Sequence, residues 1–285
     1  MKTVPVYLNE TLDPTLEAAK QKARSTYNAA SDTFDDPANA YWDRYGRRTV
    51  ERLNLSPGAS VLDVACGTGA SAIPAAKIVV PTGSVIGIDL AEKMLTRARA
   101  KAEAFGLSNI DFRQADMTQL GFADNSFDAV VCVFGIFFVP DMESLTAELL
   151  RMVKPGGKLA ITTWGPDFFE PVYSVFKNFI GEKRPDLVTH FRPWDRTTSV
   201  SGVEQLLYDG GARNIMVQAE LGEQPFLDSD SWWKMVMGSG LRGTVEALGP
   251  QLASRLRQAN NTYIKENNIR SVKTNVIYGV AKKED

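Results

Sequence analysis

The sequence predicts a doubly wound α/β fold, and three features of residues 60–164 lead to that prediction. Short apolar runs alternate with longer stretches of helical periodicity, which is the order expected of parallel strands joined by helical crossovers. The apolar runs are rich in Val, Ile and Ala and are nearly continuous, as in strands buried on both faces. The first run leads into a glycine turn and a helix start. We therefore expect a mostly parallel sheet covered by helices.

The expected elements follow from these runs and from the turn signals between them. Strands are expected at residues 60–65, 84–89, 110–114, 127–133 and 158–164, and helices at residues 70–79, 92–105 and 142–152. Two helices, 13–27 and 40–53, are expected earlier, with Pro14 in a first-turn position. After Trp164 the rhythm breaks, because residues 165–200 are aromatic and proline-bearing. Beyond them we expect helices at 202–209 and 229–268 and strands at 214–221 and 274–281.

This order of elements predicts one domain over residues 1–285. Residues 1–56 form a helical N-terminal cover, and residues 57–164 form the core that carries the glycine turn. Residues 165–272 supply cap elements and a sixth strand, and residues 273–285 supply the last strand and a tail.

Composition and charge limit the classes of partner. The net charge is −2, so no overall attraction to nucleic acid is expected. The 285 residues include two cysteines and one histidine, too few for a typical zinc site, and no metal is expected. No apolar run reaches the roughly 18 residues of a membrane span, and the first ten residues lack the apolar core of a signal peptide. We expect a cytoplasmic protein with reduced thiols and no stable membrane insertion.

The glycine turn in VLDVACGTGASA, residues 61–72, leaves two ligands open. Gly67, Gly69 and Ala72 fit the pattern G-x-G-x-x-G/A, and Asp89 lies 20 residues beyond Gly69. This is the fingerprint of a dinucleotide site, including its acidic residue. The same turn could hold the amino-acid end of S-adenosylmethionine, so the turn alone does not decide.

Three features favour S-adenosylmethionine. About 60 residues precede the turn, whereas a dinucleotide domain often begins near its first strand. Asp63 lies in the first strand, four residues before Gly67; its carboxylate would repel a pyrophosphate and could hold an ammonium. The third feature is a series of further segments, which read VIGIDLAEKML, FRQADMTQLGF, NSFDAVVCVFGIFFVPD and LLRMVKPGGKL.

With VLDVACGTG, these segments resemble class I S-adenosylmethionine-dependent methyltransferases in content and in order, across roughly residues 60–164. The sequence looks most like the small-molecule branch that includes the ubiquinone- and menaquinone-biosynthesis methyltransferases. The resemblance implies a Rossmann-like, seven-stranded, mostly parallel sheet whose last strand, 274–281, is antiparallel. It also implies S-adenosylmethionine as the cofactor.

The resemblance assigns cofactor roles by position. Backbone at Ala65, Gly67 and Gly69 would approach the methionine part of the ligand, with Ala65 standing where the family often has glycine. Asp89 would accept from both ribose hydroxyls. Asp63 could orient the loop and hold the ligand ammonium, directly or through water.

The remaining cofactor contacts come from later segments and from the N-terminal cover. Leu90 and Met94 would pack against adenine, while the carboxylate of Asp116 would accept from its amino group. The N–H of Met117 would reach a ring nitrogen, and the carbonyl of Phe134 would accept from the ammonium. Tyr27, from the N-terminal helix, would close over the ligand. Phe138, after the fourth strand, is instead a candidate for lining the acceptor cavity.

Acceptor recognition is expected in the aromatic region after the fifth strand. Trp194 and Trp233 are candidate acceptor contacts there, since an aromatic cap suits an apolar small molecule. His190, the only histidine, is a candidate general base, although a surface or structural role is the simpler reading. The sulfonium methyl is already electrophilic, so alignment and water exclusion are the main tasks.

The sequence thus predicts methyl transfer to an O, C or N atom of an apolar small molecule such as a quinone or phenol. The protein would be a monomer or a homodimer. No nucleic-acid partner is expected, because the segment after the fourth strand lacks the Asn/Asp-Pro-Pro-aromatic motif of DNA amino-methylating enzymes. The alternatives are an NAD-dependent oxidoreductase that uses the same turn, a non-catalytic protein that binds S-adenosylmethionine, and a methyltransferase with a macromolecular substrate.

Overall fold

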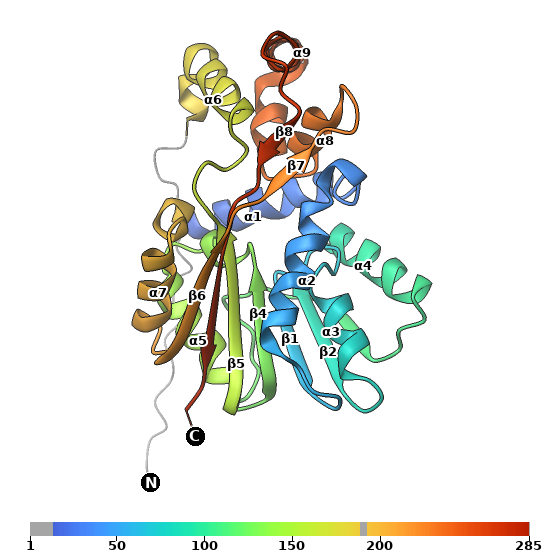
Figure 1. Cartoon of the computed structure of the whole chain (residues 1–285), viewed down its shortest axis with the longest axis vertical. Coiled ribbons are helices and arrows are strands. Elements are labelled where there is room, and N and C mark those ends of the chain that lie inside the picture. The colour runs from blue at the N-terminus through green and yellow to red at the C-terminus, as the bar shows by residue number, and fades with distance from the viewer. Residues whose placement is uncertain (1–13, 189–192, 285) are drawn as a thin grey trace.

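A twisted seven-stranded sheet organises the protein (Figure 1). The computed structural model describes residues 14–188 and 193–284. The strand order is β3-β2-β1-β4-β5-β9-β6. The strands are β1 (Ser60–Val64), β2 (Ser84–Asp89), β3 (Ile110–Gln114), β4 (Phe127–Val133), β5 (Val153–Trp164), β6 (Asn214–Glu220) and β9 (Val276–Lys282). The neighbours from β3 to β5 are parallel, so the predicted parallel core is confirmed.

Helices cover both faces of this sheet (Figure 1). One face carries α2 (Tyr41–Leu53), α3 (Ala72–Val79) and α4 (Glu92–Ala104), whereas the other carries α5 (Met142–Met152) and α7 (Val200–Asp209). These bounds lie within a few residues of the predicted ones. The order reverses between β1 and β4, since the chain leaves β1 toward β2 and β3 but later returns to β4 and β5. In such sheets, ligands bind at the carboxyl ends of the strands beside this reversal.

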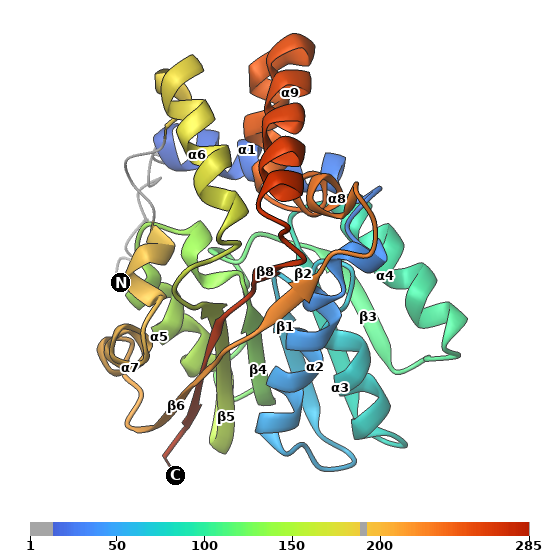
Figure 2. The ribbon, with the colours of Figure 1, turned by 45° about the horizontal axis from the view of Figure 1, so that its top comes forward.

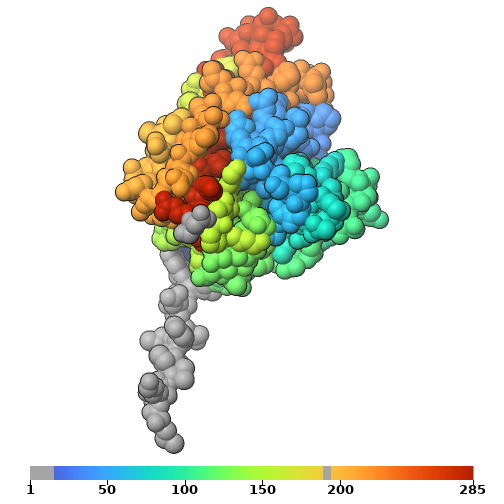
Figure 3. All heavy atoms as spheres, turned by 60° about the horizontal axis from the view of Figure 1, so that its bottom comes forward, coloured from blue at the N-terminus to red at the C-terminus, as the bar shows by residue number. Residues whose placement is uncertain are grey.

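The last strand lies inside the sheet. β9 pairs antiparallel with β5 on one side, where Tyr278 faces Thr162, and antiparallel with β6 on the other, where it faces Gln218. In Figure 3 the dark red segment of β9 reaches the surface between the orange of the β6 region and the yellow-green of β5. The seven-stranded, mostly parallel sheet with an antiparallel last strand is therefore confirmed.

A group of helices lies above the carboxyl ends of the strands (Figure 2). It contains α1 (Pro14–Ala30), α6 (Val172–Lys183), α8 (Ser231–Met237) and α9 (Leu241–Glu266), with the short ribbon of β7 (Glu223–Pro225) and β8 (Ser271–Lys273) connecting it to the sheet. Short 3-10 turns are η1 (Pro37–Asn39), η2 (Ile136–Phe138), η3 (Pro185–Leu187) and η4 (Pro193–Thr197). α1 packs on both α4 and α9, so it bridges the core and the upper helices.

The upper helices differ most from the sequence prediction. α6 was not predicted, because its segment follows an aromatic and proline-rich stretch without clear periodicity. The long helix expected at 229–268 is two helices separated near Gly238 and Gly240, and the second is kinked at Gly249, whose φ is +75°, followed by Pro250. Proline lacks the N–H that would continue the helical ladder, so the kink has a local cause.

Three further observations concern the cysteines, metal binding and membrane spans. Cys66 and Cys132 are both buried and free. Within the described ranges, no group of three or more His, Cys, Asp or Glu is placed to hold a metal ion. None of the helices that the structure describes is long and apolar enough to cross a membrane.

Candidate functional site

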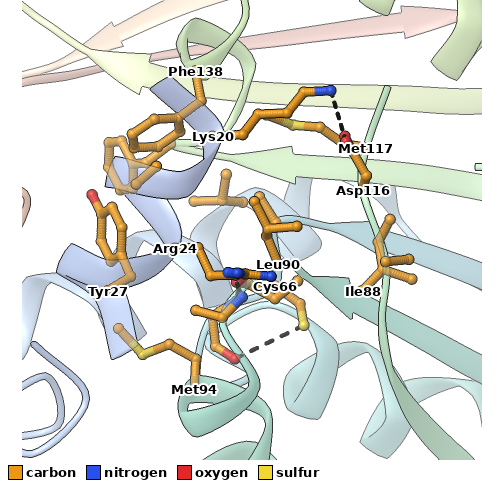
Figure 4. Close-up of a pocket in the computed structure, with 18 of the residues that line it drawn as sticks. Lys20, Arg24, Tyr27, Cys66, Ile88, Leu90, Met94, Asp116, Met117 and Phe138 are labelled. Atoms are coloured by element: carbon orange, nitrogen blue, oxygen red, sulfur yellow. Dashed lines mark hydrogen bonds and ion pairs between the residues drawn. The ribbon is translucent and has the colours of Figure 1, made fainter. Parts of the chain in front are cut away.

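A pocket opens at the carboxyl ends of β1, β2, β3 and β4, beneath helix α1 (Figure 4). It therefore lies beside the reversal of strand order, where this class of sheet binds ligands. Its floor includes the loop after β1, with Ala65 and Gly67, and its roof includes Lys20, Arg24 and Tyr27 from α1. The lining carries more apolar than polar surface and brings together segments more than 100 residues apart in the sequence.

The loop after β1 is held in an unusual backbone conformation. Ala65 has φ of +59° and Gly67 has φ of +53°; glycine adopts this left-handed region freely, whereas alanine is strained there by roughly 1 kcal/mol. The Gly67 N–H donates to Oδ2 of Asp89 over 2.9 Å. This explains why residue 65 is a position suited to glycine: the chain must turn sharply there for Gly67 to reach the end of β2.

Asp89 ends β2 and joins two loops. Its Oδ1 accepts the N–H of Ala91 over 2.8 Å, while its Oδ2 accepts the N–H of Gly67. Burial raises the pKa of this carboxyl, and these backbone N–H groups partly offset the rise. A carboxylate offers about four acceptor positions, so roughly two remain for hydroxyl donors of a ligand in the pocket.

Asp63 lies in β1 behind this lining and is 1% exposed. Its Oδ2 accepts from the Ser71 hydroxyl over 2.7 Å, whereas the buried Oδ1 has no hydrogen-bond partner among the described residues. Burial, together with the nearby charge of Asp89, raises the pKa of Asp63 to about 7, even though hydrogen bonds from Ser71 and Ala72 act in the opposite direction. An unpartnered buried oxygen is costly, so this carboxyl is suited to a cation or a water-linked donor.

The loop after β4 forms the opposite side of the floor. Phe134 has φ of +55°, and its N–H donates to the Thr162 carbonyl over 2.8 Å. Gly135 follows in a confined space: a Cβ atom on it would lie 2.7 Å from Cβ of Ala65 and 2.8 Å from Sγ of Cys132. The two strained residues, Ala65 and Phe134, thus face the same pocket, and strained backbone of this kind concentrates at functional sites.

One end of the pocket is charged. Oδ2 of Asp116 and Nζ of Lys20 lie 2.8 Å apart, and Figure 4 shows the two side chains directed at each other across the edge of the pocket. Thr118 donates to Oδ1 of Asp116 through both its N–H and its hydroxyl, each over 2.8 Å. Although burial raises the pKa of Asp116, the bonds from Lys20 and Thr118 outweigh that effect and lower it.

The other end is aromatic. The rings of Tyr27 and Phe138 meet edge-on with centroids 5.6 Å apart, and Tyr27 also contacts Phe34 at 6.4 Å. Phe34 stacks on Trp42 at 5.0 Å, and Trp42 meets the Phe134 ring edge-on at 5.3 Å. In Figure 4 Tyr27 and Phe138 lie on the side of the pocket away from Asp116. A flat apolar molecule would fit against these rings.

Comparisons with known proteins agree with this geometry. The family described as "Methyltransferase domain" matches residues 61–157. A demethylmenaquinone methyltransferase of Bacillus cytotoxicus is 31% identical over 163 residues, which cover 56% of this chain and 68% of that enzyme. The chain belongs to the class I S-adenosylmethionine-dependent methyltransferases. This membership confirms the family predicted from the sequence and its cofactor, S-adenosylmethionine.

Two further matches show how much of the chain the likeness covers. An uncharacterized protein of Mycobacterium tuberculosis is 35% identical over 166 residues, so the match spans about half, 56%, of each chain. The solved structure of phosphoethanolamine N-methyltransferase 2 from Haemonchus contortus, in complex with phosphomonomethylethanolamine and S-adenosylhomocysteine, is 18% identical with a TM-score of 0.58. That alignment covers 94% of this chain and 60% of that one, and at this identity it shows the fold alone.

The methyltransferase fold gathers most of the predicted cofactor residues in one place. The pocket is lined by Tyr27, Ala65, Gly67, Asp89, Leu90, Met94, Asp116, Met117 and Phe134, and also by Phe138. Asp63 and Gly69 are not among the lining residues. Gly69, with φ of +89°, shapes the loop through its N–H bond to the Cys66 carbonyl over 2.8 Å. The roles predicted for these residues stay predictions.

The predicted acceptor residues are less concentrated. Trp194 and Trp233 do not line this pocket; Trp194 contacts Phe137 with ring centroids 6.3 Å apart, and Trp233 lies under the Arg257 guanidinium at 5.7 Å. His190 lies outside the described residues. The candidate general base and the two tryptophans therefore stay predictions.

Sequence reasoning missed several lining residues. Lys20 and Arg24 come from α1, Phe34 from the segment between α1 and α2, Trp42 from the first turn of α2, and Thr118 from the loop after β3. A signal was present for α1, because Lys20, Arg24 and Tyr27 follow the spacing of one helical face. No local pattern places Phe34 and Trp42, since their positions depend on how the N-terminal segment folds over the sheet.

Proposed function

We propose that this protein transfers a methyl group from S-adenosylmethionine to an oxygen, carbon or nitrogen atom of an apolar small molecule. The observation that carries the proposal is the charge around the glycine loop. The Gly67 N–H, which could otherwise bind a pyrophosphate, is already bonded to Asp89, and the carboxyl of Asp63 accepts from Ser71 at the end of the same loop. Two carboxyl groups at this point disfavour a dinucleotide phosphate and favour a ligand that carries positive charge.

Each part of the pocket has a task in this proposal. When bound, S-adenosylmethionine supplies an electrophilic methyl group on a sulfonium. Asp89 would hold the ribose hydroxyls, Asp116 would accept from the adenine amino group, and the Phe134 carbonyl would accept from the ammonium. Tyr27 would close over the cofactor, and Phe138 would help to exclude water and to orient the acceptor behind the reacting bond.

The aromatic end suggests the class of acceptor. Flat rings such as those of Phe34, Trp42 and Phe138 favour an aromatic or quinonoid molecule, and several curated relatives are named demethylmenaquinone methyltransferases. We therefore propose reduced quinones and phenols as the first class to assay. A phenol must lose its proton during transfer, and His190 is the proposed base. Unchanged turnover by His190→Gln would remove that residue from the mechanism.

The test of cofactor choice is calorimetric titration with S-adenosylhomocysteine, and with NAD as the parallel control. Binding of S-adenosylhomocysteine alone, with a dissociation constant of about 1–10 μM, would support the proposal. Binding of NAD alone would select the oxidoreductase alternative. A transfer assay with radiolabelled S-adenosylmethionine and a panel of quinols and phenols would then separate an enzyme from a protein that only binds the cofactor.

The remaining partner predictions belong to the same proposal. A net charge of −2 supports an acceptor other than nucleic acid. Two buried free thiols support a reducing compartment such as the cytoplasm. Size-exclusion chromatography with light scattering would distinguish the proposed monomer from the homodimer.

A further inference from the structure

The ammonium of Lys20 is unusually well coordinated for a side chain on an outer helix. Its Nζ lies 2.8 Å from Oδ2 of Asp116, 2.9 Å from the hydroxyl oxygen of Thr118 and 3.0 Å from Oε1 of Glu17. An ammonium has three donors, so three acceptors satisfy all of them. The side chain is 11% exposed. Lys20 therefore connects α1 to the loop after β3, at the edge of the pocket.

The Asp116 carboxylate is fixed by the same contacts. Its Oδ1 accepts two bonds from Thr118, and its Oδ2 accepts from Lys20. Of about four acceptor positions on a carboxylate, three are used, and the remaining one lies on Oδ2. The oxygen that is free to accept from a ligand is thus the one that Lys20 holds in place.

We propose that Lys20 is a positioning residue of the adenine subsite, which aims Oδ2 of Asp116 at the 6-amino group of the cofactor and ties α1 over it. This inference rests on the proposed function, since it assumes that S-adenosylmethionine occupies the pocket. Lys20 acts through Asp116, so its effect is on selectivity for the amino group as well as on affinity. The lowered pKa of Asp116 agrees with a carboxylate kept ionised by these neighbours.

The alternative for a lysine at this place is a solvated surface charge, and α1 carries one for comparison. Lys22 lies two residues further along α1 and is exposed, and it has no ion pair or hydrogen bond with the part of the chain that the structure describes. Replacing either lysine with methionine removes one positive charge from the same helix. Lys22→Met is therefore a matched control for Lys20→Met.

The experiment measures binding of two ligands to the full chain by calorimetry. One ligand is S-adenosylhomocysteine, and the other is S-inosylhomocysteine, in which a carbonyl oxygen replaces the 6-amino group. A carbonyl oxygen would face the Asp116 carboxylate without a proton between them, and N1, which is protonated in this ring, could not accept the Met117 N–H, so the wild-type protein should prefer the amino form. Thermal unfolding of each variant checks that the fold is retained.

We expect Lys20→Met to weaken S-adenosylhomocysteine binding about tenfold and to reduce the preference for the amino form at least about threefold. Lys22→Met should change neither value by more than about twofold. Lys20→Arg, which keeps a charged donor, should retain most of the preference.

Other outcomes overturn the inference in distinguishable ways. Equal losses for both ligands in Lys20→Met, with the preference intact, would make Lys20 a structural contact of α1 only. Tighter binding by Lys20→Met would mean that the ammonium competes with the adenine amino group. If the wild-type protein binds S-adenosylhomocysteine and Lys20→Met has the same affinity and the same preference, only this inference fails. If the wild-type protein binds neither ligand, the proposed function fails as well.

Discussion

The two ends of the pocket present different chemistry to a ligand. At one end Asp89 and Asp116 are held by backbone N–H groups, a hydroxyl and an ammonium, so each remaining acceptor position has a fixed direction. At the other end Tyr27, Phe34 and Phe138 present rings and few polar atoms. Directional hydrogen bonds reject a ligand that lacks the right donor, whereas apolar walls discriminate weakly between molecules of similar size. The charged end is therefore expected to fix the cofactor, and the aromatic end to admit related acceptors.

The largest effect should come from removing the central carboxylate of the charged end. Asp89→Ala would leave the Gly67 and Ala91 N–H groups without their acceptor and would remove the proposed ribose contact. We expect affinity for S-adenosylhomocysteine to fall by about 100-fold or more, as calorimetry would show. Asp111→Asn is the control, because Asp111 is an exposed carboxylate paired with Arg113 at the surface. A loss under about threefold for Asp89→Ala would contradict a cofactor role.

The second largest effect should come from adding a methyl group at Gly135, the confined glycine in the loop after β4. The methyl group of Gly135→Ala would overlap Ala65 and Cys132, and overpacking of this kind costs about 1–3 kcal/mol. Denaturant unfolding should show this loss, and the displaced loop should also bind S-adenosylhomocysteine less tightly. Gly181→Ala is the matched control: it lies in α6 with no atom within 4 Å of an added Cβ, and should stabilise by about 0.5–1 kcal/mol. Equal unfolding free energies for the two variants would argue against the close approach.

A smaller effect is expected from pH. Burial and the charge of Asp89 raise the pKa of Asp63 to about 7, so below pH 7 the free protein holds a proton there that a nearby ligand cation would displace. Affinity for S-adenosylhomocysteine should therefore rise by up to about tenfold from pH 6 to pH 8. Asp63→Asn should make this profile flat. Affinity that falls over this range would exclude the linkage.

The same proton affects folding stability in the opposite direction: ligand affinity should rise with pH, whereas the contribution of Asp63 to stability should fall. The unfolded chain releases it near pH 4, whereas the folded protein retains it until about pH 7. The contribution of Asp63 to stability is therefore present below about pH 4 and is lost as pH rises toward 7. Comparing the pH dependence of unfolding in the wild-type protein and in Asp63→Asn would isolate this contribution.

The smallest effect on cofactor binding is expected at the aromatic end. Phe138→Ala removes a ring that packs on Tyr27 and should change S-adenosylhomocysteine affinity by less than about threefold. Its effect should appear instead in the relative kcat/KM values for acceptors of different size. If Phe138→Ala lowered the affinity for S-adenosylhomocysteine as much as Asp89→Ala does, the assignment of the cofactor to the charged end and of the acceptor to the aromatic end would be wrong.

The core could be predicted because its signals are local. Strands such as β1 and β4 are nearly continuous runs of apolar residues, and the turn at Gly67 follows β1 directly. Asp89 and Asp116 each stand at or just after the end of a parallel strand, and the carboxyl ends of these strands meet at one edge of the sheet. Sequence order alone therefore brings those carboxylates to one pocket.

The cap and the roof could not be predicted in the same way. α6 has only Val172, Phe176 and Ile180 buried in an otherwise mixed surface, so its periodicity is weak. Lys20 was missed because a lysine on an amphipathic helix is usually solvated, and its three acceptors come together only when α1 is placed over the loop after β3. Such long-range packing is not encoded in any short stretch of sequence.

The interior position of β9 also governs when the sheet can be completed during synthesis. Among the strands that the structure describes, β6 pairs only with β9, so the ribosome must release residues 276–282 before β6 can join. The ribbon of β7 and β8 likewise waits for residues 271–273, which form β8 and lie just before β9. A chain stalled near residue 270 would expose one edge of β5 and leave β6 detached. Unpaired edges of this kind favour aggregation, so nascent chains of this protein should depend on chaperones until translation has passed that point.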